Sequence, residues 1–287
     1  MIETAFRLVA TDLDGTLLRA DKTVSERTVG VLQRVRERGM IVALVTGRPP
    51  RRARIVAREV GIDGLAICCN GGIVLDLATG DIVHHDMMPG EVAQRLVAAI
   101  RAAIPDICFA TERGMEFGHE PAYATISAVL ENETPLTGDA HALCTAGVTK
   151  LIVRHPTMPL PDLLAAVHAV TGDAATVTHS GAPFIEVSAS GITKASALAH
   201  LCDRFGIAPA EVIAFGDMLN DLPMLAWAGR SVAVANAHPD VLTAVDEVTA
   251  TNEDDGVAVV LERLLIHPNS TSIPDDSRVS IIRHGKE

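Results

Sequence analysis

The stretch Phe6-Arg7-Leu8-Val9-Ala10-Thr11-Asp12-Leu13-Asp14-Gly15-Thr16 is an apolar run of strand length that ends in two carboxylates. In an open α/β sheet, ligands bind beyond the carboxyl ends of the strands, which is where Asp12 and Asp14 stand. Residues two apart in an extended segment point to one side, so both carboxylates can face the same small volume. Gly15 lets the backbone turn sharply, and Thr16 adds a hydroxyl. This turn offers a nucleophile, a neighbouring acid or base, and ligands for a hard cation.

The same turn also has a plainer interpretation. Aspartate and glycine are favoured in turns, because an aspartate side chain accepts hydrogen bonds from nearby backbone N–H groups. On that interpretation, Asp12 and Asp14 only cap an acidic strand-to-helix turn. Polar groups at other strand ends decide between the two, since a ligand site in such a sheet draws on several strands.

Helices and strands alternate after this turn. The spacing in Thr23-Val24-Ser25-Glu26 predicts a helix start, and Gly39 predicts the end of that helix. Continuous apolar runs at 41–45 and 65–69 predict strands buried on both faces, with a second helix starting near Pro49. That helix carries a basic run that predicts a solvated face: Arg51, Arg52, Arg54 and Arg58. Strands and helices joined by short links predict a parallel, doubly wound core.

The pattern changes after residue 83. The runs 73–77 and 82–85 predict a hairpin that leaves the core. Beyond it, the order helix, strand, strand occurs twice, at 89–103, 107–111 and 115–118 and again at 161–170, 175–179 and 184–188. This repeated order predicts a separate α/β domain. Alternation typical of the core resumes at Ile192.

These patterns predict an α/β fold made of two domains and a tail. The core is a Rossmann-like, doubly wound parallel sheet at 1–83 and 190–267, and an α/β cap domain is inserted at 84–189. Residues 268–287 lack sustained periodicity, so we expect a mobile tail there. At 287 residues the chain is long enough to bury a core in each domain.

Composition narrows the class of protein and of partner. A net charge of −12 and an aromatic content of 3% argue against a nucleic-acid surface, which needs basic patches and stacking rings. No apolar run is long enough for a membrane span and no secretory signal precedes the first strand, so we expect a cytoplasmic protein. Five cysteines without C-x-x-C spacing predict free thiols rather than disulfides or a metal site.

Three further motifs stand at the ends of predicted core elements. Thr46-Gly47-Arg48 follows the second strand, Lys194 opens a helix, and the run from Gly216 to Asp221 follows a strand at 212–215. Lys194 is unusual by composition, because the chain has 20 arginines and only 4 lysines. Each motif alone has an ordinary explanation: a helix cap, a solvated lysine, or first-turn carboxylates favoured by the helix dipole. Together they supply the local positive charge and the ligands that a phosphate site on an acidic protein needs.

In order and setting, these four motifs resemble those of the haloacid dehalogenase (HAD) superfamily, specifically the Cof-type phosphatases with a large α/β cap between the second and third motifs. The resemblance covers about residues 6–266 and includes two further segments, 233–237 and 252–257. One departure is Ala195, where the family often has glycine after the lysine. The lysine is retained, so the charge that this motif supplies is present.

The resemblance implies a role for each carboxylate. Asp12 attacks the phosphorus to form an aspartyl-phosphate, and Asp14 acts first as the acid and then as the base. Mg²⁺ is the implied cofactor, because a hard cation offsets the repulsion between a carboxylate nucleophile and a phosphate. Its implied ligands are the side chains of Asp12, Asp217 and Asp221, the last direct or through water, and the backbone carbonyl of Asp14.

The resemblance also implies phosphate contacts, by Leu13, Thr46, Gly47, Lys194 and Asn220. Thr46 would donate a hydrogen bond to a phosphoryl oxygen, and Lys194 would offset charge and position Asp12. Further candidates for contacting the substrate are Arg48, Asn70, Arg113 and Glu186. We expect most polar residues on or near the cap strands to face solvent: Arg113, Glu116, His119, Arg154, His179, Ser180 and Glu186.

The predicted function is hydrolysis of phosphate monoesters of small metabolites, such as sugar phosphates or phosphorylated cofactors, by a Mg²⁺-dependent phosphatase through an aspartyl-phosphate. The predicted partner is a small phosphorylated metabolite rather than nucleic acid or membrane, and we expect a monomer or a homodimer. Two alternatives stay open. One is a phosphotransferase or phosphomutase, which passes the phosphoryl group to a sugar hydroxyl. The other is a catalytically silent protein that binds a phosphate ligand.

Overall fold

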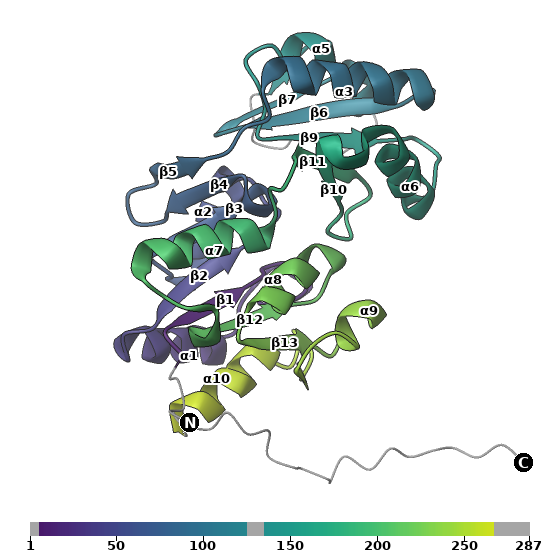
Figure 1. Cartoon of the computed structure of the whole chain (residues 1–287). Coiled ribbons are helices and arrows are strands. Elements are labelled where there is room, and N and C mark those ends of the chain that lie inside the picture. The colour runs from purple at the N-terminus through teal and green to yellow at the C-terminus, as the bar shows by residue number, and fades with distance from the viewer. Residues whose placement is uncertain (1–5, 125–134, 267–287) are drawn as a thin grey trace, which may run out of the picture.

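Two sheets organise the computed structural model, which describes residues 6–124 and 135–266 (Figure 1). The larger sheet has eight strands in the order β14-β13-β12-β1-β2-β3-β4-β5, and the smaller has six in the order β10-β11-β9-β6-β7-β8. The predicted α/β class, with a mainly parallel core sheet and a second α/β unit, is confirmed. Within the described ranges, no helix is both long and apolar enough to cross a membrane. The tail predicted at 268–287 lies outside these ranges.

The core sheet is parallel from β14 to β3 and antiparallel at β4 and β5. Its strands are β1 (Leu8–Thr11), β2 (Ile41–Val45), β3 (Leu65–Cys68), β4 (Ile73–Asp76), β5 (Ile82–His85), β12 (Val212–Gly216), β13 (Arg230–Val234) and β14 (Glu247–Thr249). The hairpin β4–β5 was expected to leave the core, and this is wrong. It pairs with β3 and extends the sheet, because β3 would otherwise be an unpaired edge.

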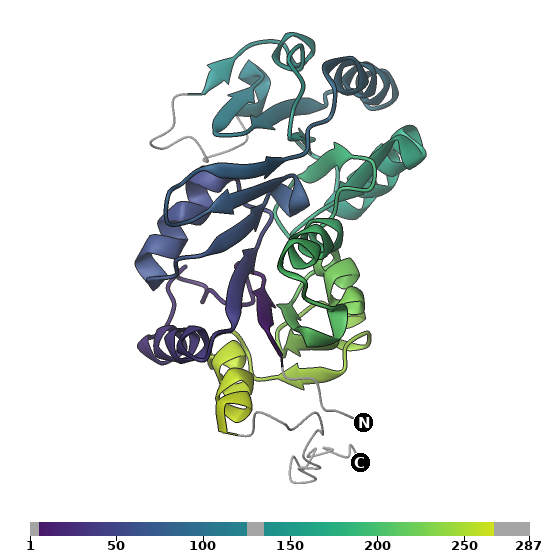
Figure 2. The same cartoon turned by 60° about the vertical axis from the view of Figure 1, so that its left-hand side comes forward.

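Helices cover both faces of this sheet (Figures 1 and 2). One face packs against α1 (Glu26–Glu37), α2 (Pro50–Val60) and α10 (Gly256–Ile266), and the other against α7 (Lys194–Phe205), α8 (Leu222–Trp227) and α9 (Pro239–Leu242). In β1, Val9 belongs to the first apolar cluster and Leu8 and Ala10 to the second, all with no exposed surface. Three 3₁₀ turns complete the core: η1 (Cys69–Gly71), η3 (Pro209–Glu211) and η4 (Leu219–Asp221).

The first helix begins later than its capping pattern predicted. It begins at Glu26, and Ser25 is the N-cap, whose hydroxyl accepts a hydrogen bond from the Thr28 N–H at 3.0 Å. Thr23 instead donates its hydroxyl to Asp21 at 2.6 Å and belongs to the preceding turn. Two serine or threonine residues so close together offered two cap positions, and the tertiary structure uses the second.

The cap sheet is covered by helices on one face. Its strands are β6 (Cys108–Arg113), β7 (Glu116–His119), β8 (Leu136–Thr137), β9 (Lys150–Arg154), β10 (Ala175–Thr178) and β11 (Ile185–Ala189). The helical elements of this part are α3 (Gly90–Ala103), α4 (Pro121–Ala124), α5 (Ala140–Leu143), α6 (Leu160–Thr171) and η2 (Gly172–Ala174). Sequence patterns did not predict β9, which lies between β6 and β11 in this sheet.

Alternation along β9 and β11 separates the two faces of the cap sheet. Leu151, Val153 and Ile185 join the cluster that packs against α3 and α6. Lys150 and Glu186 occupy the other parity, so their side chains lie on the opposite face. That face lies over the core loops that follow β1, β2 and β12, because residues of both line one cavity.

Candidate active site

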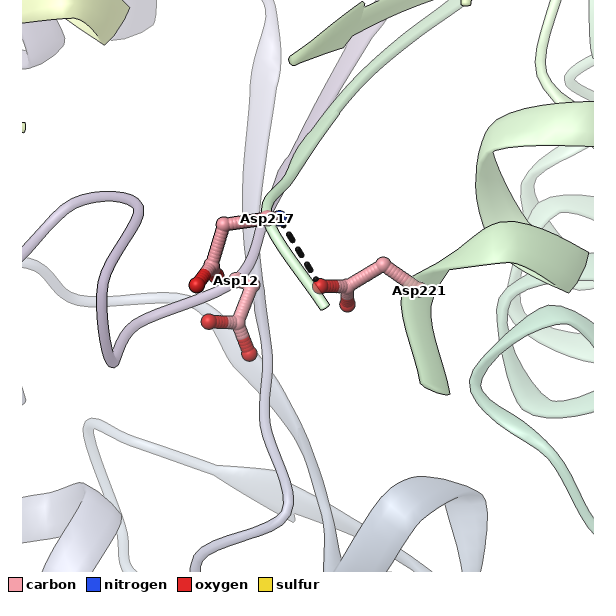
Figure 3. A group of neighbouring side chains, drawn as sticks. All are labelled: Asp12, Asp217 and Asp221. Atoms are coloured by element: carbon pink, nitrogen blue, oxygen red, sulfur yellow. Dashed lines mark hydrogen bonds between the residues drawn. The ribbon is translucent and has the colours of Figure 1, made fainter. Parts of the chain in front are cut away.

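Three buried carboxylates gather where β1 and β12 end. Asp12 follows β1, Asp217 follows β12, and Asp221 ends η4; one oxygen from each lies within 4.8 Å of the others. Figure 3 shows the three side chains together, although they come from segments some 200 residues apart in the sequence. β1 and β12 are parallel neighbours, so their carboxyl ends meet at one edge of the sheet.

Lys194 neutralises part of this cluster. It is the first residue of α7, where Thr193 and Ser196 form a capping box. Its Nζ donates to Oδ1 of Asp12 at 2.5 Å and to Oδ1 of Asp221 at 2.6 Å. Burial alone would lower the pKa of Lys194, but the charges of Asp12 and Asp221 outweigh it and raise that pKa, so the lysine stays charged.

The turn after β12 is fixed by Asp221. Its Oδ2 accepts hydrogen bonds from the backbone N–H groups of Asp217 and Met218, both at 3.0 Å; the first is the dashed line in Figure 3. Gly216 makes this turn possible, because a Cβ there would lie only 2.6 Å from Cβ of Asp221. Both oxygens of Asp221 therefore already have partners within the protein.

The turn after β1 holds Asp217 in place. Thr16 donates its hydroxyl to Oδ1 of Asp217 at 2.7 Å. Gly15 has φ +85°, and a Cβ there would stand 2.4 Å from Oδ2 of Asp217. Asn236, in the segment 233–237 that carries part of the family resemblance, donates to the Gly15 carbonyl at 2.8 Å. Glycine is thus required here both by backbone conformation and by the close approach of Asp217.

Crowding of like charges makes this cluster suited to a cation. Burial raises the pKa of Asp12 well above its usual value, with Asp221 and Asp217 adding to the effect and Lys194 opposing it. Burial, and then repulsion from Asp221, raises the pKa of Asp217 to about 6. Positive charge among these oxygens would relieve both effects. The donor set consists of carboxylate oxygens, which hard divalent cations prefer.

Asp14 lies at the outer edge of the cluster and has different neighbours. Arg48 donates two hydrogen bonds to the Asp14 carboxylate, from Nε to Oδ2 at 2.6 Å and from Nη2 to Oδ1 at 2.7 Å. Lys22 Nζ donates a third, to Oδ1, at 2.9 Å. Burial alone would raise the pKa of Asp14, but Arg48 and Lys22 outweigh it and lower that pKa. In this arrangement Asp14 is therefore an ionised, firmly held carboxylate.

The turn after β2 brings a hydroxyl to the same place. Thr46 is buried, and its Oγ1 accepts a hydrogen bond from the Arg48 N–H at 3.1 Å. The hydroxyl proton is not used in this bond and can be donated to another group. Asn220 Nδ2 donates to Oδ1 of Asn70 at 3.0 Å, which joins the turns after β3 and β12. The Leu13 side chain is packed in the core, so only its backbone is available for a phosphate contact.

A cavity of about 770 Å³ separates these loops from the cap sheet. From the predicted set it is lined by Asp12, Asp14, Thr46, Gly47, Arg48, Asp217, Asn220 and Glu186. Leu13, Asn70, Lys194, Asp221 and Arg113 are not lining residues. Lys194, Asp221 and Asn70 instead form hydrogen bonds with residues that line the cavity, and the Leu13 side chain is buried in the core. Arg113 turns to Glu116 across the β6–β7 hairpin.

Three residues at this interface were not predicted from the sequence. Arg51, expected on a solvated face, reaches from α2 to the cap strand β6 and makes hydrogen bonds of 2.6 and 3.0 Å to the Glu112 carboxylate. Lys150, on β9, donates to the Gly47 carbonyl at 2.7 Å and to Glu186. One signal was present: Lys22, Lys150 and Lys194 are three of the four lysines in an arginine-rich chain.

Comparisons with known proteins agree with this geometry. A family model described as haloacid dehalogenase-like hydrolase matches residues 9–261. The chain is 32% identical over 267 residues to the 5-amino-6-(5-phospho-D-ribitylamino)uracil phosphatase of Bacillus subtilis, a match that covers 91% of this chain and 98% of that protein. It is 28% identical over 275 residues to the HMP-PP phosphatase of Yersinia enterocolitica, covering 94% and 99%.

A solved structure shows the same architecture. The haloacid dehalogenase-like hydrolase from Bacteroides thetaiotaomicron matches with a TM-score of 0.75 and 30% sequence identity. The match covers 90% of this chain and 99% of that one, so both sheets are included.

Proposed function

Since the chain belongs to the haloacid dehalogenase-like hydrolases, as its motifs predicted, we propose that it is a phosphatase acting on phosphate monoesters of small metabolites. One observation carries the proposal: Lys194 holds Asp12 at 2.5 Å beside two further carboxylates, at the floor of a roofed cavity. The relatives from Bacillus subtilis and Yersinia enterocolitica are named as phosphatases of small phosphorylated molecules. A cavity of about 770 Å³ suits a ligand of that size and excludes a folded polypeptide.

Asp12 is the proposed nucleophile. Lys194 binds its Oδ1, which leaves Oδ2 to attack the phosphorus. A bond forms between this oxygen and phosphorus while the bond from phosphorus to the ester oxygen breaks, which gives an aspartyl-phosphate and the free alcohol. Water then attacks the same phosphorus, releases inorganic phosphate and restores the Asp12 carboxylate. Thr46 supplies a hydroxyl donor to the phosphoryl oxygens during both steps.

Asp14 is the proposed proton carrier. It gives a proton to the departing ester oxygen and later takes one from the attacking water. Arg48 and Lys22 now hold it as a carboxylate, and an incoming phosphate dianion competes with Asp14 for both cations. We infer that substrate entry loosens this grip and lets Asp14 take up the proton that it transfers.

The carboxylate cluster fits a divalent cation. Three carboxylates and one lysine ammonium leave two negative charges, and the ligand atoms are all hard oxygens. Asp12 and Asp217, with the Asp14 carbonyl, would hold Mg²⁺, while Asp221, whose oxygens are already bonded, positions Lys194 and the turn or binds through water. When bound, the cation offsets charge on the phosphoryl group.

A phosphate-release assay on the full chain tests the proposal. p-Nitrophenyl phosphate and a panel of metabolite monoesters, including the substrate named for the Bacillus subtilis relative, are incubated with Mg²⁺ and, in parallel, with EDTA. We expect inorganic phosphate release that needs Mg²⁺ and no sugar acceptor. Transfer to an added sugar in place of release would instead identify a phosphotransferase, and binding without turnover would identify a silent phosphate-binding protein. The cytoplasmic location and the monomeric or dimeric state stay predictions.

A further inference from the structure

The roof of the cavity carries a carboxylate oxygen without a partner. Glu186 lines the cavity and is only 1% exposed. Its Oε1 accepts a hydrogen bond from Lys150, but its Oε2 is buried and has no hydrogen-bond partner among the residues that the structure describes. A buried acceptor left unpaired destabilises a protein, unless a bound ligand or water satisfies it.

Lys150 also has hydrogen-bonding capacity left over. It is 2% exposed and lines the same cavity, and an ammonium group has three N–H donors. Its recorded acceptors in the described part of the chain are two, the Gly47 carbonyl at 2.7 Å and Oε1 of Glu186. One N–H donor of Lys150 and one acceptor oxygen of Glu186 are therefore left over within one buried ion pair.

This pair overhangs the phosphate-binding turn. A Cβ placed on Gly47 would lie 3.6 Å from Oε1 of Glu186, and Gly47 follows Thr46 directly. A ligand group that reaches the pair while the phosphate lies at Thr46 must therefore stand close to the ester bond. More distant parts of the leaving group would meet the apolar wall made by Phe117, Ile152 and Phe184.

Charge and hydrogen-bonding capacity select the ligand group. An ammonium group would be repelled by Lys150 and a carboxylate by Glu186, while a carbonyl has no proton for the free acceptor. A hydroxyl satisfies both, because one oxygen can donate to Glu186 and accept from Lys150. We propose that Glu186 and Lys150 bind a hydroxyl on the first or second carbon beyond the ester carbon, so that the enzyme selects phosphorylated polyols or sugars over plain alkyl phosphates. This inference rests on the proposed phosphatase function and deepens it.

Four three-carbon esters test the inference in the unaltered protein. Propyl phosphate has no hydroxyl, 2-hydroxypropyl and 3-hydroxypropyl phosphate have one each, and glycerol 1-phosphate has both. We expect kcat/KM for at least one single-hydroxyl ester to exceed that for propyl phosphate at least about tenfold, as for a hydrogen bond to a charged group. Equal values for all four would overturn the inference and leave the phosphatase function standing. No phosphate release, even from p-nitrophenyl phosphate, would overturn the proposed function as well.

Glu186→Gln tests whether Glu186 causes the preference for an ester with a hydroxyl. The glutamine oxygen can still accept from Lys150, while its NH₂ group replaces the free acceptor. We expect the variant to lose most of the hydroxyl preference, so that the ratio of kcat/KM for the preferred single-hydroxyl ester to that for propyl phosphate falls toward one. Glu116→Gln, an exposed cap position outside the cavity lining, is the matched control and should keep the preference. An unchanged preference in Glu186→Gln would contradict the proposal. Should that variant not fold, the ester series alone decides.

Discussion

Asp12 and Asp14 stand two residues apart, and their neighbours give them different surroundings. Asp12 is 5% exposed and lies against Lys194, Asp217 and Asp221, so it is held rigidly and away from water. The Asp14 side chain is 33% exposed and meets Arg48 and Lys22 at the edge of the cavity. A buried, oriented carboxylate suits nucleophilic attack, while one near solvent suits proton exchange.

Replacing Asp12 tests its proposed role as the nucleophile. Asp12→Asn keeps the shape of the side chain but removes the charge, so we expect turnover to fall at least about a thousandfold while the fold persists. Phosphate release and a thermal unfolding curve measure the two effects. Asp203→Asn, exposed on α7, is the control and should leave activity unchanged. Turnover near the parent rate would remove Asp12 from its assigned role.

Gly15 offers a second test, because its backbone conformation and its closeness to Asp217 both require glycine. Gly15→Ala demands a side chain at φ +85° and places its Cβ against the Asp217 carboxylate. We expect the free energy of unfolding to fall by about 1–3 kcal/mol and the concentration of Mg²⁺ needed for half-maximal activity to rise. Gly30→Ala, on α1 with open space around it, should be neutral or stabilising by up to about 1 kcal/mol. Equal effects of the two changes would refute the argument.

Sequence patterns identified the site residues that directly follow strands, but they missed residues whose side chains connect the core to the cap. Asp12, Thr46 and Asp217 follow buried strands, and parallel topology brings such ends together. Arg51 and Lys150 act through contacts between distant segments, about 60 and 100 residues from their partners. No local pattern encodes such a distance.

The strand β9 shows how one element serves two surfaces. Its odd-numbered residues Leu151 and Val153 pack against the cap helices, while Lys150 and Ile152 line the cavity. Its N-terminal residue, Lys150, donates a hydrogen bond to the Gly47 carbonyl and so joins the middle of the cap sheet to the turn after β2. The strand thus packs the cap and positions it over the core.

Removing one member of the Lys150–Glu186 pair should destabilise the protein more than removing both. Lys150→Met leaves a buried carboxylate without its cation, so we expect a loss of about 3–5 kcal/mol in the free energy of unfolding. The double change Lys150→Met with Glu186→Leu should recover most of it, because no buried charge is then unpaired. Urea unfolding of the parent, both single variants and the double variant gives these values.

Arg113→Met supplies the control for this cycle. Its pair with Glu116 lies in the same sheet but is 35% and 56% exposed, so we expect a change of less than about 1 kcal/mol. If Lys150→Met lowered the free energy of unfolding as little as Arg113→Met does, the buried pair would not be important for stability.

Two elements, the strand β9 and the hairpin β4–β5, show where sequence patterns were insufficient. The apolar part of β9 is only Leu151-Ile152-Val153, too short to stand out by periodicity. The hairpin β4–β5 has the composition of strands in either domain, and pairing with β3 decides its place. The helices and the parallel strands were predictable because their apolar patterns extend over several residues, as in α1 and β2.

In the whole molecule, the cavity of the candidate active site lies between two separately packed units. Each sheet has its own apolar clusters, and polar contacts such as Arg51–Glu112 and Lys150–Gly47 join them across the cavity. Polar interfaces of this kind can open and close more readily than apolar cores. For the proposed function, opening of this interface would admit substrate and closing would shield the reaction from water.

A bound cation should stabilise the assembled molecule. We expect Mg²⁺ at about 100 times its Kd to add about 2.7 kcal/mol to the free energy of unfolding, and EDTA to abolish activity. Because the pKa of Asp217 is raised to about 6, protons compete with the cation below that pH, so the added stability should shrink as pH falls through 6. Thermal unfolding with and without Mg²⁺ measures it. Asp217→Asn should lose the gain; a gain of equal size in that variant would place the cation elsewhere.

Trapping a covalent intermediate would directly test the proposal that Asp12 is the nucleophile. Asp14→Asn should still allow attack by Asp12 but lack the base that activates water, so phosphoryl-enzyme should accumulate with an activated ester such as p-nitrophenyl phosphate and Mg²⁺. Acid quenching and mass spectrometry of the digested protein then locate the modification. We expect one added phosphoryl group, and we expect it on Asp12. A phosphoryl group on another residue, or turnover with none on the protein, would contradict it.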